Sequence, residues 1–169
     1  LRTMEGPNHS RRRPLASPAC TPNAAERLRP FMREVVNGLV DKFAATGKCE
    51  LVEDLCEPYP IPIICELLGA PKEDWKLFSN WATDIFRIFN GDFDNDQHLI
   101  VKASQELTAY VLALIAQRRA DPKDDLLSDF IAAEETGDRM SNAELCMMTQ
   151  AVLLAGPRTT RTHIACSMA

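Results

Sequence analysis

The sequence lacks the long apolar runs and the leader that would place it across a membrane. No continuous apolar stretch reaches the ~18 residues that a membrane span requires, and no segment has the charged, apolar and small-residue order of a signal peptide. The 169 residues are 46% apolar and 25% charged, which suits one globular core and matches no disordered or fibrous class. We therefore expect a cytoplasmic protein without a membrane span.

Basic charge is also scarce in this sequence. The formal net charge is -5 and the isoelectric point is about 5.2, whereas a protein that binds a phosphate backbone needs a basic surface. The exception is "HSRRR" at residues 9–13. Such a run would suit a nucleic-acid patch, but on an acidic protein it is more often a solvated face or an internal ligand site. We therefore do not expect a nucleic-acid partner.

The cysteines show no pattern that is typical of a metal site. None belongs to a CxxC pair, and none has partner histidines at zinc-finger spacing. The six are Cys20, Cys49, Cys56, Cys65, Cys146 and Cys166. We interpret them as scattered, mostly buried thiols of a reducing compartment, with no metal ligand among them.

What the sequence does contain is helical periodicity along most of its length. Apolar residues recur at steps of three and four after Thr21 and Pro22, which predicts a helix that ends before Gly47. A further helix is predicted through 55–70, with its first half made irregular by prolines and its better helical part at 63–68. Others are predicted at 75–89, 99–119 and 124–135, and from a capping box at Ser141 and Glu144 onward. A short extended segment is expected near residues 49–52, and a loop at 91–96. Because no alternation of period two is long enough for a sheet, the predicted fold class is all-α.

The last predicted helix contains an unusual turn, "AGPRTT" at residues 155–160. A glycine in a helix interior costs about 1 kcal/mol and a proline about 3 kcal/mol, because one loosens the backbone and the other removes a hydrogen bond. One interpretation is a bend, or a helix that ends at Gly156. The other is a deliberate opening of the backbone where a flat or bulky ligand packs closely.

A resemblance favours the second interpretation. The order of "GPNHSRRRPLASPACTP", "RLRPFMREVVNGLVDKF", "LVEDLCEPYPIPIICELLGAP", "DDLLSDFIAAEETGDRMSNAEL" and "AVLLAGPRTT" resembles the middle of a bacterial-type cytochrome P450, from its C helix to its I helix. The last helical pattern has no cap before Ala169, so we expect residues 1–169 to form a single partial domain that is truncated at both ends.

The resemblance implies part of a heme-thiolate monooxygenase. Such an enzyme holds heme, iron protoporphyrin IX, and inserts one atom of dioxygen into a small apolar organic substrate. Its electrons come from NAD(P)H through a ferredoxin-type or flavoprotein donor. The loop that carries the family's heme thiolate has a glycine two residues after its cysteine, and none of the six cysteines here has one. The thiolate ligand is therefore expected to lie outside this sequence.

The resemblance also implies roles for the turn at residues 155–160. The small Ala155 and Gly156 let the helix approach the heme. Thr159 takes the catalytic threonine position, where its hydroxyl bonds back to the Ala155 carbonyl, orders water and delivers protons. Arg158 stands where the family has an acid, and an arginine donates hydrogen bonds only. We expect oxygen activation to be poor as a result.

Two other groups of residues take their roles from the resemblance. His9 and Arg13, four residues apart, would hold a heme propionate, with Pro14 altering the helix that carries them. Four apolar side chains of residues 75–89 would line the substrate pocket, although core packing is the alternative for each. They are Trp81, Ile85, Phe86 and Phe89.

A second class of function stays open at this stage. A non-catalytic or degenerate helical relative would keep the fold without heme chemistry, and the missing thiolate and Arg158 favour it. Thr159, His9 and Arg13 favour the enzyme.

Overall fold

The computed structural model describes residues 21–135 and 141–168, together with Gly6 and Pro14. Within them the chain is helical and contains no strand, so the all-α prediction is confirmed. The main helices are α2 (Pro22–Ala44), α3 (Pro60–Leu68), α4 (Trp75–Phe86), α5 (Phe93–Ala120), α6 (Leu126–Glu135) and α7 (Asn142–Met168). Three short helical turns, η2 (Leu51–Cys56), η3 (Lys72–Asp74) and η4 (Arg87–Phe89), join them.

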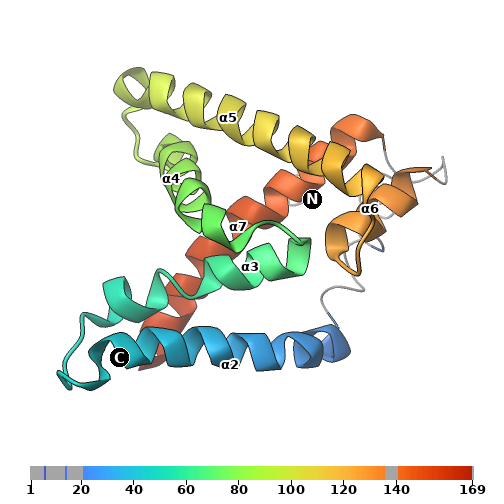
Figure 1. The fold of residues 1–169 in the computed structure, drawn as a ribbon. Coiled ribbons are helices and arrows are strands. Elements are labelled where there is room, and N and C mark those ends of the chain that lie inside the picture. The colour runs from blue at the N-terminus through green and yellow to red at the C-terminus, as the bar shows by residue number, and fades with distance from the viewer. Residues whose placement is uncertain (1–5, 7–13, 15–20, 136–140, 169) are drawn as a thin grey trace.

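Helix α7 contacts most of the other elements of the fold. This helix runs diagonally through the molecule, and α3, α4, α5 and α6 all contact it (Figure 1). α2 lies at one edge, where it contacts α3 and η2, and α5 lies at the opposite edge. The core therefore forms where α3 to α7 meet. Its largest fully buried side chains are Phe130, Leu68, Leu107, Leu127, Leu145, Val111, Thr149, Cys56 and Cys65.

Local sequence signals explain several helix boundaries. The Ser141 amide donates to the Glu144 carboxylate at 2.7 Å, and the Glu144 amide donates to the Ser141 hydroxyl at 3.3 Å, so the predicted capping box is confirmed. α2 ends at Ala44, before Gly47, as expected. α3 spans Pro60–Leu68, inside the helix predicted through 55–70, and it can begin at Pro60 because a proline in the first turn of a helix gives up no helical hydrogen bond.

Two expectations for irregular segments are wrong. In the segment expected to be extended near 49–52, Glu50 has extended dihedral angles, but residues 51–56 form a π-helical turn. Leu55 and Cys56 are buried in that turn, which contacts α7, so tertiary packing decides its conformation. The loop expected at 91–96 is also shorter, since α5 begins at Phe93 with Asp94 and Asp96 in its first turn, where the helix dipole favours acids.

α5 is the helix within the described residues that is long and apolar enough to cross a membrane, judged by length and composition alone. Such a helix is weak support for a span, since the core helix of a globular protein passes the same test. Leu107, Val111 and Leu114 of α5 are buried in the core of this molecule. The packing therefore gives these three residues a role inside the fold, whereas Val101 and Leu112 of the same helix are exposed.

A buried ion pair joins α3, α5 and α6. Arg118 Nε lies 2.9 Å from Asp125 Oδ2, and each side chain is only 5% exposed. Arg118 Nη2 also donates to the carbonyl of Gly69, the residue that ends α3 with φ of 71°. Asp125 Oδ1 accepts the amide of Ser128 in the first turns of α6 at 2.8 Å. One charge pair thus anchors the ends of three helices.

Candidate functional site

The turn at residues 155–160 lies inside a continuous helix. α7 runs through Gly156 and Pro157 to Met168, so the interpretation that the helix ends at Gly156 is wrong. Pro157 is buried and has no amide hydrogen, so the Leu153 carbonyl four residues earlier receives no helical hydrogen bond from it. The helical hydrogen-bond pattern of α7 therefore lacks one bond at this turn.

Threonine hydroxyl groups donate hydrogen bonds to backbone carbonyls next to that missing helical bond. Thr159 Oγ1 donates to the Ala155 carbonyl oxygen at 2.9 Å and lies 3.4 Å from the Gly156 carbonyl oxygen. The bond from Thr159 back to Ala155, predicted from the sequence, is confirmed. Thr162 repeats it one turn later, donating to the Arg158 carbonyl at 3.0 Å. A threonine that bonds back in this way bends a helix slightly and fixes its own rotamer.

Gly156 has a packing partner on α3. A Cβ atom added at Gly156 would lie 2.3 Å from Cδ1 and 3.1 Å from Cγ1 of Ile64. Because real Cβ atoms do not come that close to other atoms, the glycine allows α3 to pack against α7 at this point. This contact accounts for the glycine whether or not a ligand approaches it.

The opposite side of α7 is exposed and carries small residues. Ala151, Ala155, Thr159 and Thr162 are exposed, whereas Leu153 and Pro157 are buried. Positions three or four apart share one face of a helix. α7 therefore packs against α3 with one side and presents small and hydroxyl side chains with the other, where the exposed Arg158 lies at the border of the stripe, three residues after Ala155 and four before Thr162.

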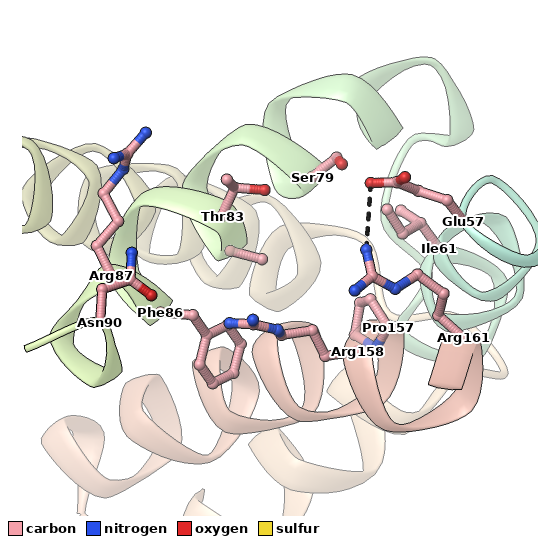
Figure 2. A pocket seen from close by; sticks show the side chains of 11 residues that line it. Glu57, Ile61, Ser79, Thr83, Phe86, Arg87, Asn90, Pro157, Arg158 and Arg161 are labelled. Carbon is pink, nitrogen blue, oxygen red and sulfur yellow. Dashed lines mark ion pairs between the residues drawn. The ribbon is translucent and has the colours of Figure 1, made fainter. Parts of the chain in front are cut away.

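A cavity of about 310 Å³ lies between the C-terminal half of α4, α7 and the segment that leads into α3 (Figure 2). Its volume is at the lower end of the range for small-molecule sites. Its lining is Glu57, Ile61, Ser79, Ala82, Thr83, Phe86, Arg87, Asn90, Pro157, Arg158 and Arg161. The cavity is thus bordered by the same turn of α7 that the sequence singled out.

The three arginines of this cavity differ in their partners. Arg87 contacts Asp84 at 3.0 Å and Asp96 at 3.2 Å, and the hydrogen bond to Asp84 raises the pKa of Arg87 above its ordinary value. Arg161 Nη1 lies 3.7 Å from the Glu57 carboxylate.

Arg158 has a different kind of neighbour. Its guanidinium lies 5.0 Å from the centroid of the Phe86 ring, which is a cation–π distance. Among the described residues, no carboxylate lies within ion-pair distance of it. In Figure 2 the side chain extends along the cavity from α7 to Phe86.

The structure separates the four apolar residues that were expected to line a substrate pocket. Phe86 lines the cavity. Trp81 is buried in the core and donates from Nε1 to Glu106 at 2.9 Å, and Ile85 packs against the same core. Phe89 is 77% exposed and stacks on Phe86. Core packing is therefore the role of Trp81 and Ile85.

The predicted ligands of a heme propionate, His9 and Arg13, fall outside the described residues. Within those residues, no three His, Cys, Asp or Glu side chains gather as a metal site would require.

Sequence reasoning missed most of the polar lining. Ser79 and Thr83 of α4 and Arg87 at the start of η4 follow one another at helical spacing, and Arg158 and Arg161 do so on α7. That spacing indicates that each of these helices has a polar face that could line a cavity. Which two faces meet follows only from the packing of α4 near α7.

Comparison with curated proteins places this chain beside bacterial oxygenases, although no family model matches it. It is 37% identical to the mycinamicin IV hydroxylase/epoxidase of Micromonospora griseorubida, over 98% of this chain and 41% of that protein. It is 34% identical to the polyketide biosynthesis cytochrome P450 PksS of Bacillus subtilis, over 91% of this chain and 37% of that protein. The chain thus spans about two fifths of the length of these relatives.

Solved structures agree with these comparisons. The cytochrome P450 enzyme CxnD, for C–S bond formation in chuangxinmycin biosynthesis, matches with a TM-score of 0.83 and 33% identity over 95% of this chain and 39% of that one. The crystal structure of CalO2 matches with a TM-score of 0.87 and 29% identity over 94% of this chain and 40% of that one.

Proposed function

Because the chain belongs to the cytochrome P450 family, we propose that it forms part of a heme-thiolate monooxygenase that inserts one oxygen atom into an apolar organic substrate. The observation that carries this proposal is the hydrogen bond from Thr159 to the Ala155 carbonyl on the exposed face of α7. Its electrons would come from NAD(P)H through a ferredoxin-type or flavoprotein donor. Residues 1–169 would form one partial domain of a cytoplasmic protein.

The exposed face of α7 fits a flat cofactor. Ala151 and Ala155 are small and exposed, so a planar macrocycle can approach the helix backbone there without displacing side chains. In this proposal His9 and Arg13 bind a heme propionate, and Gly156 keeps α7 seated on α3 behind the cofactor. Bound heme would supply the site for dioxygen and its reduction. No cysteine of this sequence has the spacing of the family's thiolate loop, so that ligand would come from outside it.

Thr159 would position water for proton transfer on this face. Its hydroxyl hydrogen is used in the bond to the Ala155 carbonyl, which leaves its oxygen lone pairs free to accept a hydrogen bond from water. A water held there lies beside the small residues where the cofactor would bind. The threonine would thus position the water that passes protons to the reacting oxygen.

Arg158 weakens the same relay. The family has an acid at this position, and a guanidinium stays protonated and cannot hand on a proton. We expect a protein with Arg158 to activate oxygen poorly and to lose electrons as hydrogen peroxide. The alternative function, a degenerate relative without heme chemistry, is favoured by this one substitution.

The experiment is a carbon monoxide difference spectrum of the reduced protein, expressed from its complete gene and reconstituted with heme. A red-shifted Soret band that is typical of thiolate ligation would support the monooxygenase. Failure to take up heme would support the degenerate relative instead. A Thr159→Val variant is the matched test of the relay, since it keeps the side-chain shape and removes the hydroxyl. It should retain the Soret band and form less product for each electron consumed.

A further inference from the structure

We infer that the cavity between α4 and α7 binds a small organic carboxylate through Arg158. This inference goes beyond the proposed oxygen chemistry, because the cavity is built by residues of this chain and would bind its ligand whether or not heme is present. It rests on three features: the Arg158 guanidinium without a carboxylate partner among the described residues, the arrangement of hydroxyl groups opposite it, and the apolar wall beside them.

Arg158 is the arginine of this cavity that has no carboxylate partner. Arg87 contacts Asp84 and Asp96, and Arg161 contacts Glu57. In the part of the chain that the structure describes, Arg158 borders the cavity with the Phe86 ring as its neighbour. The three arginines and these three carboxylates sum to zero charge, so a ligand carboxylate would give Arg158 an ion-pair partner without having a net positive charge to neutralise.

The apolar part of the lining distinguishes between classes of anion. Glu57 would repel a doubly charged phosphate more strongly than a carboxylate, but the arginines would also attract it more strongly, and a guanidinium can donate two parallel N–H groups to either anion. Ile61, Ala82 and the Phe86 ring offer apolar contacts that inorganic phosphate cannot use. An organic carboxylate is thus the better match.

The Phe86 ring prepares Arg158 for this role. The guanidinium lies 5.0 Å from the ring centroid, and such a contact at an exposed site favours the rotamers over the ring by about 0.5–1 kcal/mol. This bias lowers the entropic cost of binding an anion there.

The remaining lining suits an organic ligand. Ser79 and Thr83 of α4 lie across the cavity from Arg158, where their hydroxyl groups can donate to the same carboxylate (Figure 2). Ile61, Ala82 and the Phe86 ring give the cavity an apolar wall. A ring or short chain attached to the carboxylate would bury apolar surface there.

The test uses calorimetric titration of the protein expressed from its complete gene, with benzoate as the probe. Benzamide is the neutral match of the same shape, and inorganic phosphate distinguishes a site for organic carboxylates from one for free anions. We expect benzoate to bind at least fivefold more tightly than either. Equal binding of benzoate and benzamide, preference for phosphate, or no benzoate binding would each overturn the inference.

Substitutions of Arg158 test whether benzoate binds in this cavity. Arg158→Met should weaken benzoate binding about tenfold, because hydrogen bonds to a charged group are lost, and should leave benzamide binding unchanged. Arg158→Lys should restore part of the affinity. Arg33→Met on α2 is the matched control for loss of an exposed arginine outside the cavity and should have no effect. Unchanged benzoate affinity in Arg158→Met, with a melting temperature equal to that of the wild type, would overturn the inference.

The carbon monoxide spectrum of the same preparation separates this inference from the proposed function. A thiolate-type Soret band without benzoate binding would overturn the carboxylate site alone. Benzoate binding that depends on Arg158, without heme uptake, would overturn the monooxygenase alone.

Discussion

Ile64 on α3 occupies the space into which a side chain at Gly156 on α7 would project. Its Cδ1 atom would lie 2.3 Å from a Cβ added at Gly156. The two helices therefore approach each other as closely as they do because one residue has no side chain. This contact positions the turn that carries Arg158 and Thr159.

The first prediction concerns this contact. Gly156→Ala should lower the free energy of unfolding by about 1 kcal/mol, because overpacking costs about 1–3 kcal/mol and the better helix propensity of alanine returns about 1 kcal/mol of it. Urea unfolding followed by circular dichroism measures the change. In an Ile64→Val background, which lacks Cδ1, the same substitution should be neutral or stabilising. An equal cost in both backgrounds would show that this contact does not decide the effect.

This contact also illustrates what the sequence could reveal about the fold. Periodicity, the proline at the start of α2 and the capping box at Ser141 act over a few residues, so they predicted those helices correctly. The neighbour of Gly156 lies on another helix, and no local pattern identifies it. The same limit explains the error at residues 51–56, whose conformation depends on contact with α7.

The second prediction concerns the buried ion pair of Arg118 and Asp125. Asp125→Asn keeps an acceptor for the Ser128 amide but leaves the Arg118 charge buried without a counter-ion. We expect the free energy of unfolding to fall by about 3 kcal/mol. Asp124→Asn is the matched control, since the Asp124 side chain is 99% exposed, and should change it by less than about 0.5 kcal/mol. Similar losses in the two variants would contradict a special role for the buried pair.

The third prediction concerns the pH dependence of stability. Burial of Cys65 raises the pKa of its thiol from 9.0 to about 12. The unfolded chain therefore releases this proton near pH 9, whereas the folded chain keeps it until about pH 12. The contribution of Cys65 to stability is complete below pH 9 and is lost as the pH rises toward 12.

Unfolding free energies of the wild type and of Cys65→Ala, measured at about pH 8 and about pH 11, test this expectation. The decline between the two conditions should be smaller in the variant. The comparison is needed because burial also raises the pKa of Tyr110, whose ordinary value of about 10 lies between the two conditions and which is present in both proteins. Identical declines would mean that Cys65 ionises alike in the folded and unfolded chains.

The candidate site was predictable only in part, for a physical reason. The bond from Thr159 to Ala155 is local, four residues along one helix, and the sequence predicted it correctly. The cavity is assembled from α4, α7 and the segment before α3, and its geometry follows from their packing. The sequence therefore identified Arg158 as an unexpected residue without revealing that it stacks on Phe86.

The last prediction returns to Arg158 as a replacement for an acid. In the reconstituted monooxygenase, Arg158→Asp should raise the amount of product formed for each electron consumed severalfold, because a carboxylate beside Thr159 can pass protons and a guanidinium cannot. Arg158→Met separates the two effects of this change, since it removes the guanidinium without adding an acid. If Met and Asp improve the ratio equally, the arginine merely obstructs the site. If neither changes it, proton delivery does not limit this protein, and the acid position has no part in its chemistry. An increase with Asp alone would mean that the fold around α7 still supports the relay, with a single side chain interrupting it.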